Sequence, residues 1–252
     1  MILFLAGTSD ARALASRLQA KGYNLLASVV TDSAAVSLQA EGIPYRVGRM
    51  NEEQMLELVD TRSVKCIVDA SHPFAEEASK TAMNTSLCRN IPYIRYERPD
   101  VPFEHPLITK VDSYEEAALT AKERKGVIML TTGSKTLAVF TKHLLGEDLR
   151  LLCRMLPNKE NMEKCESLGL AQKDIIAIQG PFSKELNIAL YNQYGVTQMV
   201  TKESGKVGSI DEKMEAAIEL GIEIILIKRP RIEYDNRCTT FEEVEQQLGG
   251  FF

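Results

Sequence analysis

The stretch Ile2–Asp10 (ILFLAGTSD) decides the fold class. An apolar run followed by a glycine and a polar helical pattern is typical of a strand buried in a parallel sheet that leads into a helix. Gly7 allows a tight turn, Thr8 and Ser9 offer hydroxyl groups, and the beginning of the helix presents free N–H groups to an anion. The stretch therefore indicates a site for an anionic, nucleotide-like group, with a simple helix cap at Ser9 or Asp10 as the alternative.

The same alternation of short apolar runs and amphipathic stretches continues along most of the chain. Several apolar runs lack polar alternation, as strands covered on both faces should. The pattern predicts an α/β fold of two Rossmann-like parallel-sheet domains. The expected strands are Ile2–Ala6, Asn24–Val30, Val64–Ala70, Tyr93–Tyr96, Val127–Thr132, Leu149–Met155, Ile175–Gln179, Gln198–Thr201 and Ile222–Lys228, and the expected helices include Ala11–Lys21, Glu52–Asp60, Glu76–Cys88 and Glu212–Leu220.

The alternation stops at residues 97–112, where three prolines fall in a charged segment. Proline removes a backbone donor and is unfavourable inside both helices and central strands. We interpret this segment as a linker between an N-terminal Rossmann-like domain, residues 1–100, and a C-terminal α/β domain, residues 101–252. A cleft between the two domains is where we expect a ligand.

The composition disfavours several classes of function. The 252 residues carry a formal net charge of −5, which argues against nonspecific nucleic-acid binding. No apolar run reaches the roughly 20 residues that span a bilayer, and the N-terminal MILFLAG lacks the basic lead of a signal peptide. The five cysteines are scattered and the three histidines lie far apart, so we expect reduced thiols, no metal site and a cytoplasmic location.

Further candidate residues in the first half follow predicted strands. Arg12 lies in the first turn of the helix after Gly7, where it adds a charged donor for an anion. Asp32 follows the second strand, at a place where an acid often accepts the ribose 2′-hydroxyl of a dinucleotide, or else caps the next helix. Ser71 and His72 follow the strand that ends at Ala70; we expect them at a ligand site, with a cap or a solvated histidine as the alternative.

The segment Thr132–Ser134 repeats the strand–glycine–hydroxyl pattern in the second half. It is not an NTPase phosphate loop, because Ser134 stands where that pattern needs a glycine before the lysine. Arg154 lies at the end of another predicted strand, where its guanidinium can meet an anion. The segment Lys202–Ser204 follows a later strand, and its Lys–Glu pair indicates a carboxylate site, a nicotinamide contact or an exposed ion pair.

Taken in order, these loops resemble one enzyme family. Their order is similar to that of the precorrin-6A reductases of corrin-ring (vitamin B12) biosynthesis, and the resemblance runs from Ile2 to about Arg229. Thr31-Asp32 and residues 47–53 look more like the oxygen-independent branch, which acts on cobalt-precorrin-6A and is associated with NADH. The motifs that carry the resemblance are GTSDARALA at 7–15, DASHPFA at 69–75, YERP at 96–99, TTGSKTL at 131–137, CRMLP at 153–157, QGPFS at 179–183 and TKESG at 201–205, followed by K-x-x-A-A.

The resemblance implies hydride transfer from a reduced nicotinamide, NADH with NADPH as the alternative, to one double bond of a tetrapyrrole-derived corrin precursor. Its implied partners are that precursor and other corrin-pathway enzymes. We expect neither nucleic acid nor a membrane as a partner. Any cobalt arrives bound inside the macrocycle. The implied site residues are His72 and Lys202 for catalysis; Gly7, Thr8, Ser9, Arg12, Asp32, Thr132, Gly133 and Ser134 for the cofactor; and Ser71, Arg154, Glu203 and Ser204 for the substrate.

The residues bear on three rival hypotheses. A short-chain dehydrogenase needs a Tyr-x-x-x-Lys motif, and none of the eight tyrosines has a lysine four positions later. A methyltransferase of the same pathway would need an adenosylmethionine site, and nothing in the sequence points to one. A non-catalytic dinucleotide-binding sensor is the alternative from a different class, because binding loops do not prove turnover.

Overall fold

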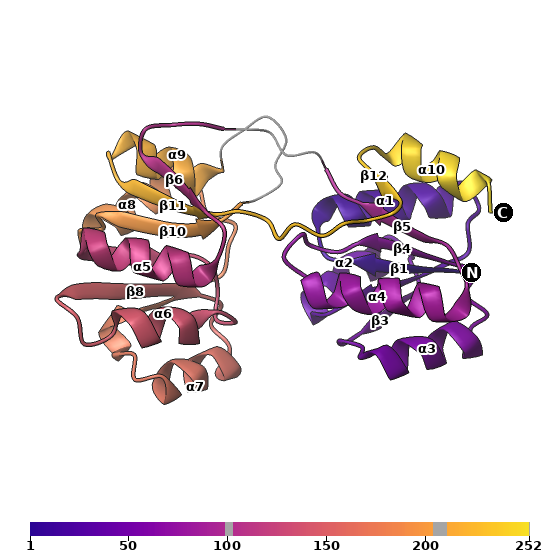
Figure 1. Ribbon diagram of the computed structural model, residues 1–252, viewed down its shortest axis with the longest axis horizontal. Helices are drawn as coiled ribbons and strands as arrows, with labels where there is room; N and C mark the ends of the chain where they lie inside the picture. Colours follow the sequence, from indigo (N-terminus) through magenta and orange to yellow (C-terminus); the bar gives the residue numbers. More distant parts are fainter. Residues whose placement is uncertain (99–102, 204–210, 252) are drawn as a thin grey trace. The chain divides into compact units, whose positions relative to one another are not determined.

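The computed structural model describes residues 1–98, 103–203 and 211–251 (Figure 1). The chain divides into two compact units. Met1–Pro99 and Pro230–Phe252 form the first unit, and Asp100–Arg229 form the second. Within the described residues each unit contains one six-stranded sheet whose strand pairs are all parallel. The predicted α/β class with two Rossmann-like sheets is confirmed.

The sheet of the first unit has the strand order β12-β5-β4-β1-β2-β3. Its strands are β1 (Ile2–Ala6), β2 (Leu25–Val29), β3 (Tyr45–Val47), β4 (Cys66–Ala70), β5 (Tyr93–Tyr96) and β12 (Arg237–Cys238), and its helices are α1 (Ser9–Ala20), α2 (Asp32–Ala40), α3 (Glu52–Thr61), α4 (Glu76–Arg89) and α10 (Phe241–Gly249).

Two hydrophobic clusters cover the two faces of this sheet. Alternate residues of β1 divide between them, because successive side chains of a strand point to opposite faces. Phe4 joins a cluster with residues of α1, α2 and α10, whereas Leu3 joins one with Met55 of α3 and Ala82 of α4. This double coverage explains why β1 is apolar throughout rather than alternating.

The sheet of the second unit has the strand order β6-β11-β10-β7-β8-β9. On β10, Met199 packs in a cluster with residues of α8 and α9, while the amide of the adjacent Gln198 donates to the Ala121 carbonyl of α5. Helices therefore cover both faces here too. The strands are β6 (Ile108–Val111), β7 (Gly126–Leu130), β8 (Leu149–Met155), β9 (Ile175–Ala177), β10 (Gln198–Lys202) and β11 (Glu223–Ile227), and the helices are α5 (Tyr114–Arg124), α6 (Leu137–Leu144), α7 (Lys159–Ser167), the 3-10 turn Gln172–Asp174, α8 (Lys184–Tyr194) and α9 (Glu212–Glu219).

Each sheet has a point at which the order of its strands reverses. In the first unit the chain runs from β1 to β2 and β3 on one side, and continues with β4 and β5 on the other. In the second unit it runs from β7 to β8 and β9, and continues with β10 and β11 on the other side. Ligands of open α/β sheets bind beyond the carboxyl ends of the strands at such reversals. The loops after β1, β4, β7 and β10 are therefore the places to look for a site.

The predicted domain of residues 101–252 is wrong at its C-terminal end, because the last segment of the chain returns to the first unit. There β12 extends the sheet: the Arg95 N–H donates to the Asn236 carbonyl over 2.8 Å, and the Glu97 N–H donates to the Cys238 carbonyl over 2.9 Å. Helix α10 then buries Val244 in the same core as Phe4. A two-residue strand carries no periodic signal, so the sequence pattern did not reveal this return.

The segment interpreted as a linker contains a strand. Residues Ile108–Val111 form β6, the edge strand that pairs with β11 in the second unit. The prolines at 99, 102 and 106 all precede β6, so they do not interrupt its ladder. None of the helices in the described part of the chain is both long and apolar enough to cross a membrane.

Candidate functional site

The loops after β1 and β4 touch at the strand-order reversal of the first unit. A Cβ atom on Gly7 would lie 2.7 Å from the backbone nitrogen of His72 and 3.2 Å from the Cα of Ser71. Real Cβ atoms do not approach backbone atoms that closely, so only glycine fits at position 7. The sequence predicted a tight turn there; the structure adds that Gly7 allows the two loops to pack together.

Gly7→Ala is expected to lower kcat/KM by roughly 10–100-fold, because the added methyl group must displace one loop from the other, and a shift of about 1 Å near a reaction centre has that order of effect. Gly249→Ala is the matched control, since its Cβ meets nothing within 4 Å. Both variants are to be compared in steady-state kinetics. Wild-type kinetics in Gly7→Ala would contradict a functional contact between these loops.

Thr8, and not Ser9 or Asp10, caps α1. Its Oγ1 accepts the N–H of Ala11 over 3.1 Å, so the capping alternative named the wrong residues. Ser9 is exposed at the first position of the helix, and Asp10 forms an ion pair with Arg98. The helix thus begins immediately after Gly7, which leaves first-turn N–H groups at the carboxyl edge of the sheet, as an anion site requires.

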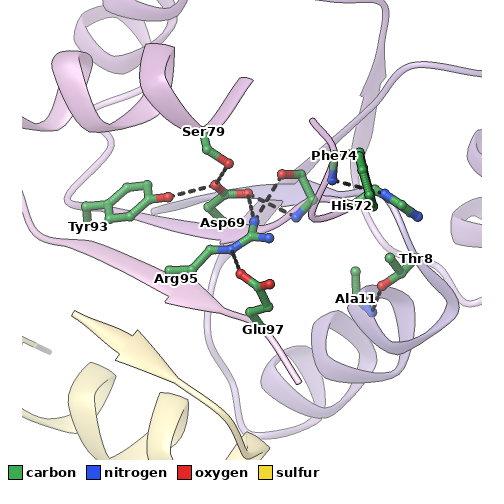
Figure 2. A network of polar contacts seen from close by, with 10 residues as sticks. Thr8, Ala11, Asp69, His72, Phe74, Ser79, Tyr93, Arg95 and Glu97 are labelled. Atoms are coloured by element: carbon green, nitrogen blue, oxygen red, sulfur yellow. Dashed lines mark hydrogen bonds and ion pairs between the residues drawn. The ribbon is translucent and has the colours of Figure 1, made fainter. Parts of the chain in front are cut away.

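A buried charge network holds the loop after β4 (Figure 2). The carboxylate of Asp69, fully buried at 0% exposure, lies 3.0 Å from Nη1 of the equally buried Arg95 on β5. Its second oxygen accepts hydrogen bonds from the hydroxyls of Ser79 and Tyr93, both over 2.7 Å. Arg95 also contacts Glu97 through Nε over 3.2 Å.

The network favours the ionised form of Asp69. Burial alone would raise the pKa of this carboxyl, but the charge of Arg95 and the hydrogen bonds from Ser71, Ser79 and Tyr93 hold it below its ordinary value. The aromatic ring of Tyr234, from the returning C-terminal segment, lies 5.2 Å from the Arg95 guanidinium. The hydrophobic pattern of β4 and β5 did not predict this network. The available signal was a charged residue inside each of two apolar strands, which implies a buried partner.

Ser71 and His72, predicted at the site, have different surroundings. Ser71 is buried: its N–H donates to Asp69 over 2.9 Å, and its hydroxyl accepts from Arg95 Nη1 over 3.2 Å. His72 is exposed, and its Nδ1 accepts the N–H of Phe74 over 3.2 Å. The buried network therefore fixes the backbone from which the imidazole of His72 projects.

Arg12 and Asp32, also assigned to the cofactor, lie on the adjacent helices. The Nε atom of Arg12 is 3.1 Å from a carboxylate oxygen of Glu41, so its charge is partly engaged. Asp32 is exposed in the first turn of α2, where Thr31 and not Asp32 supplies the cap by accepting from Ala34 over 3.3 Å. The cap alternative for Asp32 is therefore wrong, and its carboxylate lies just beyond the carboxyl end of β2.

The glycine loop after β7 differs from the loop after β1. Gly133 has φ +79°, a conformation that favours glycine, and nothing lies within 4 Å of its would-be Cβ. Thr132 is buried and its hydroxyl accepts from Thr136, whereas Ser134 is half-buried. Helix α6 begins only at Leu137, so the predicted hydroxyl groups precede its first turn rather than form it.

The end of β10 brings together several charged side chains. Burial, and then the like charges of Lys135 and Lys213, lower the pKa of Lys202. The carboxylate of Glu203 accepts the N–H of Arg229 over 3.1 Å, which fixes it beside the end of β11. Ser204, predicted to bind substrate, lies outside the described residues.

Arg154 lines a cavity of about 480 Å³ in the second unit. Its Nη1 donates to the Asn187 side-chain oxygen over 2.6 Å, and its guanidinium lies 4.5 Å from the centre of the Phe182 ring. Thr131 and Gly133 line the same cavity, so the structure brings the loop after β7 and the end of β8 to one place. Among the described residues, no group of three or more His, Cys, Asp and Glu side chains is placed to hold a metal ion.

Comparison with known proteins identifies the family. The model of the family described as "Precorrin-6x reductase CbiJ/CobK" matches residues 1–249. The chain belongs to this family. It is 60% identical over 249 residues to a protein of Priestia megaterium named cobalt-precorrin-6A reductase, covering 98% of each chain. The family resemblance that we found in the sequence is therefore confirmed.

More distant relatives carry related names. A cobalt-precorrin-6A reductase of Salmonella typhimurium is 35% identical over 232 residues, which cover 91% of this chain and 87% of that protein. A precorrin-6A reductase of Rhodococcus erythropolis is 30% identical over 238 residues, covering 91% and 89%. A solved structure titled "CobK precorrin-6A reductase" matches with a TM-score of 0.78 at 24% identity, covers 99% of this chain and 96% of that chain, and supports the same fold.

Proposed function

We propose that this protein reduces cobalt-precorrin-6A to the 6B form with a reduced nicotinamide cofactor, a step of cobalamin biosynthesis. The observation that carries the proposal is the 60% identity, over nearly the whole of both chains, to a protein named for that reaction. Relatives named for the cobalt-containing substrate have identities from 60% down to 31%, whereas two relatives named for precorrin-6A have identities of 30% and 25%. This gradation favours the cobalt-containing substrate.

The first unit offers features that fit a dinucleotide. Gly7 is exposed and lies directly before α1, whose first-turn N–H groups suit a pyrophosphate. We assign the cofactor contacts to Gly7, Thr8, Ser9, Arg12 and Asp32, with Thr132, Gly133 and Ser134 as further candidates on the second unit. When bound, a reduced nicotinamide supplies the hydride that reduces one double bond of the macrocycle.

NADH is the proposed cofactor, with NADPH as the alternative. Asp32 lies exposed after β2, where a carboxylate accepts a ribose 2′-hydroxyl and repels a 2′-phosphate. The neighbouring cation Arg46 is partly committed elsewhere, because its Nη1 donates to Ser28 over 3.0 Å and to the Gly48 carbonyl over 2.7 Å. The cytoplasmic location and the interaction with other corrin-pathway enzymes stay predictions.

The reduction requires a proton on the carbon next to the one that receives the hydride. We propose His72 and Lys202 as the donors to test, since each lies at a strand-order reversal; on His72 the proton has to come from Nε2, because Nδ1 accepts the N–H of Phe74. The other substrate contacts are assigned to Ser71, Arg154, Glu203 and Ser204. The N–H and the hydroxyl of Ser71 already contact Asp69 and Arg95, so we propose that Ser71 contributes by fixing the position of its loop next to the substrate.

The pH dependence of turnover tests Lys202 as the donor. An ammonium that gives up a proton fails above its pKa, so kcat should fall at alkaline pH. Lys135→Met removes a like charge that lowers the pKa of Lys202, so the alkaline limb should move to higher pH. Lys142→Met, an exposed lysine on α6, is the control and should leave the profile unchanged. A limb that stays in place in Lys135→Met would assign the proton to another group.

The proposed function is tested by the rate of nicotinamide oxidation with four pairs of reactants: NADH or NADPH, each with cobalt-precorrin-6A or its metal-free form. We expect the fastest turnover with NADH and the cobalt-containing substrate. A sensor protein would bind the dinucleotide and leave it reduced in all four reactions.

A further inference from the structure

The cavity of the second unit contains an arginine that is held in place before any ligand arrives. Arg154 is only 7% exposed, and its guanidinium lies over the ring of Phe182 at 4.5 Å. Nη1 donates to Asn187 over 2.6 Å, and the amide of the fully buried Asn187 in turn donates to the Ser183 carbonyl over 2.7 Å. One aromatic face and one amide therefore fix the plane of the guanidinium.

This arrangement leaves part of the guanidinium available to a ligand. Within the described residues, Arg154 has no carboxylate ion-pair partner, and its only hydrogen bond is the one from Nη1. Its Nε and Nη2 are not among the buried atoms that lack a partner, so they are not sealed inside the protein. Burial lowers the pKa of Arg154, and a desolvated cation of this kind gains strongly from an anion.

The other walls of the cavity favour a carboxylate on a largely apolar ligand. Met155, Leu156, Ile178 and Pro181 supply apolar surface beside the guanidinium. Asp211 also lines the cavity, but one of its oxygens caps α9 by accepting from Met214, and the other is paired with Lys213. The two carboxylates of the lining, Asp211 and Glu212, offset the charges of Arg154 and Lys213, so the cavity suits a single carboxylate better than a doubly charged phosphate.

We propose that this cavity is a carboxylate subsite, in which Arg154 binds one acidic arm of the macrocyclic substrate and Phe182 and Asn187 act as positioning residues. This inference rests on the proposed function for the identity of the ligand. Arginine matches a carboxylate with two parallel N–H groups in a fixed plane, and its stacking on an aromatic ring selects that plane. A volume of about 480 Å³ accepts an arm and the adjoining edge of a ring, within the usual range for ligand pockets.

The experiment uses the full chain and two readouts. One is the Kd for uroporphyrin, a stable tetrapyrrole with eight carboxylates, followed by its absorbance change. The other is KM for cobalt-precorrin-6A and for NADH in the reductase assay. Arg154→Gln should raise the Kd for uroporphyrin and the KM for the macrocycle by about 10–100-fold, because it removes a charged hydrogen-bonding partner, and should leave the KM for NADH unchanged.

Arg150→Gln is the matched control on the same strand. Arg150 also contacts an aromatic ring, Tyr194 at 5.7 Å, and is paired with Asp174 over 2.7 Å, but it is not among the residues that line the cavity. It should bind uroporphyrin as the wild type does. Arg154→Lys should recover only part of the affinity, since an ammonium lacks the planar fork, and Phe182→Leu should raise the KM for the macrocycle with kcat nearly unchanged.

Each outcome has a definite meaning for the subsite. Unchanged uroporphyrin affinity in Arg154→Gln would overturn it, as would a raised KM for NADH alone, which would assign the cavity to the cofactor. A wild-type protein that binds uroporphyrin through Arg154 but never oxidises a nicotinamide would support the subsite while contradicting the proposed reductase. If Arg154→Gln binds the macrocycle as tightly as the wild type and the wild type oxidises the nicotinamide, the result would support the reductase while contradicting the subsite.

Discussion

Asp69→Asn is expected to lower the free energy of unfolding of the first unit by about 3–5 kcal/mol, because it leaves the buried charge of Arg95 without its closest carboxylate. The measurement is denaturant unfolding, together with hydrogen exchange of the peptides that contain β4 and β5. Activity should fall with stability, since the same carboxylate anchors the N–H of Ser71.

The pH dependence gives this prediction a second readout. The folded-state pKa of Asp69 is below its ordinary value near 4, so its stabilising contribution is complete above that value and is lost as the pH falls toward the folded-state pKa. Asp69→Asn should lack this acid-side loss. Asp60→Asn is the control, because Asp60 pairs with Arg89 at the surface, where such pairs contribute little. Equal stability of Asp69→Asn and Asp60→Asn would show that the buried pair does not hold the loop.

Removal of residues 230–252 is expected to unfold the first unit. The deletion takes away β12, which pairs with β5, and α10, which buries Val244 and Leu248 in the core. The strands of the first unit should then exchange their amide hydrogens rapidly, while β7 and β10 of the second unit keep their protection. Hydrogen exchange read by mass spectrometry measures both sets of strands in one experiment.

A point substitution tests the same role if the shortened chain cannot be produced in folded form. Leu248→Ala removes a side chain at 0% exposure and should cost about 3 kcal/mol of stability. Phe251→Ala, in the same segment but at 43% exposure, should cost far less. Protection of the first unit that is unaffected by Leu248→Ala would refute a structural role for the returning segment.

Much of the fold could be predicted from the sequence because its strands are apolar on both faces. The bounds of β1, β5 and β8 agree with the prediction residue by residue. The prediction missed β3, an exposed edge strand of three residues, β6, which lies in the segment interpreted as a linker, and β12, which has only two residues. All three are short and lack the long apolar run on which such predictions depend.

The candidate site was only partly accessible from the sequence. The sequence predicted Gly7 and His72 in loops after strands and Arg154 at a strand end, and the structure places all three at carboxyl ends of strands, while their roles stay predictions. The partners that fix them were missed, because Arg95 reaches Asp69 from another strand and Asn187 reaches Arg154 from a helix further along the chain. Such contacts depend on the register between elements, which no single stretch of sequence records.

The central claim, that this chain transfers a hydride from a nicotinamide to the macrocycle, is tested most directly by an isotope label. NADH that carries deuterium at the transferable position is mixed with the protein and cobalt-precorrin-6A. The mass of the corrinoid product is then measured by mass spectrometry. The account predicts one deuterium atom in each product molecule, and no labelled product when the protein has been inactivated by heat. A protein that binds both reactants and forms no labelled product would contradict it.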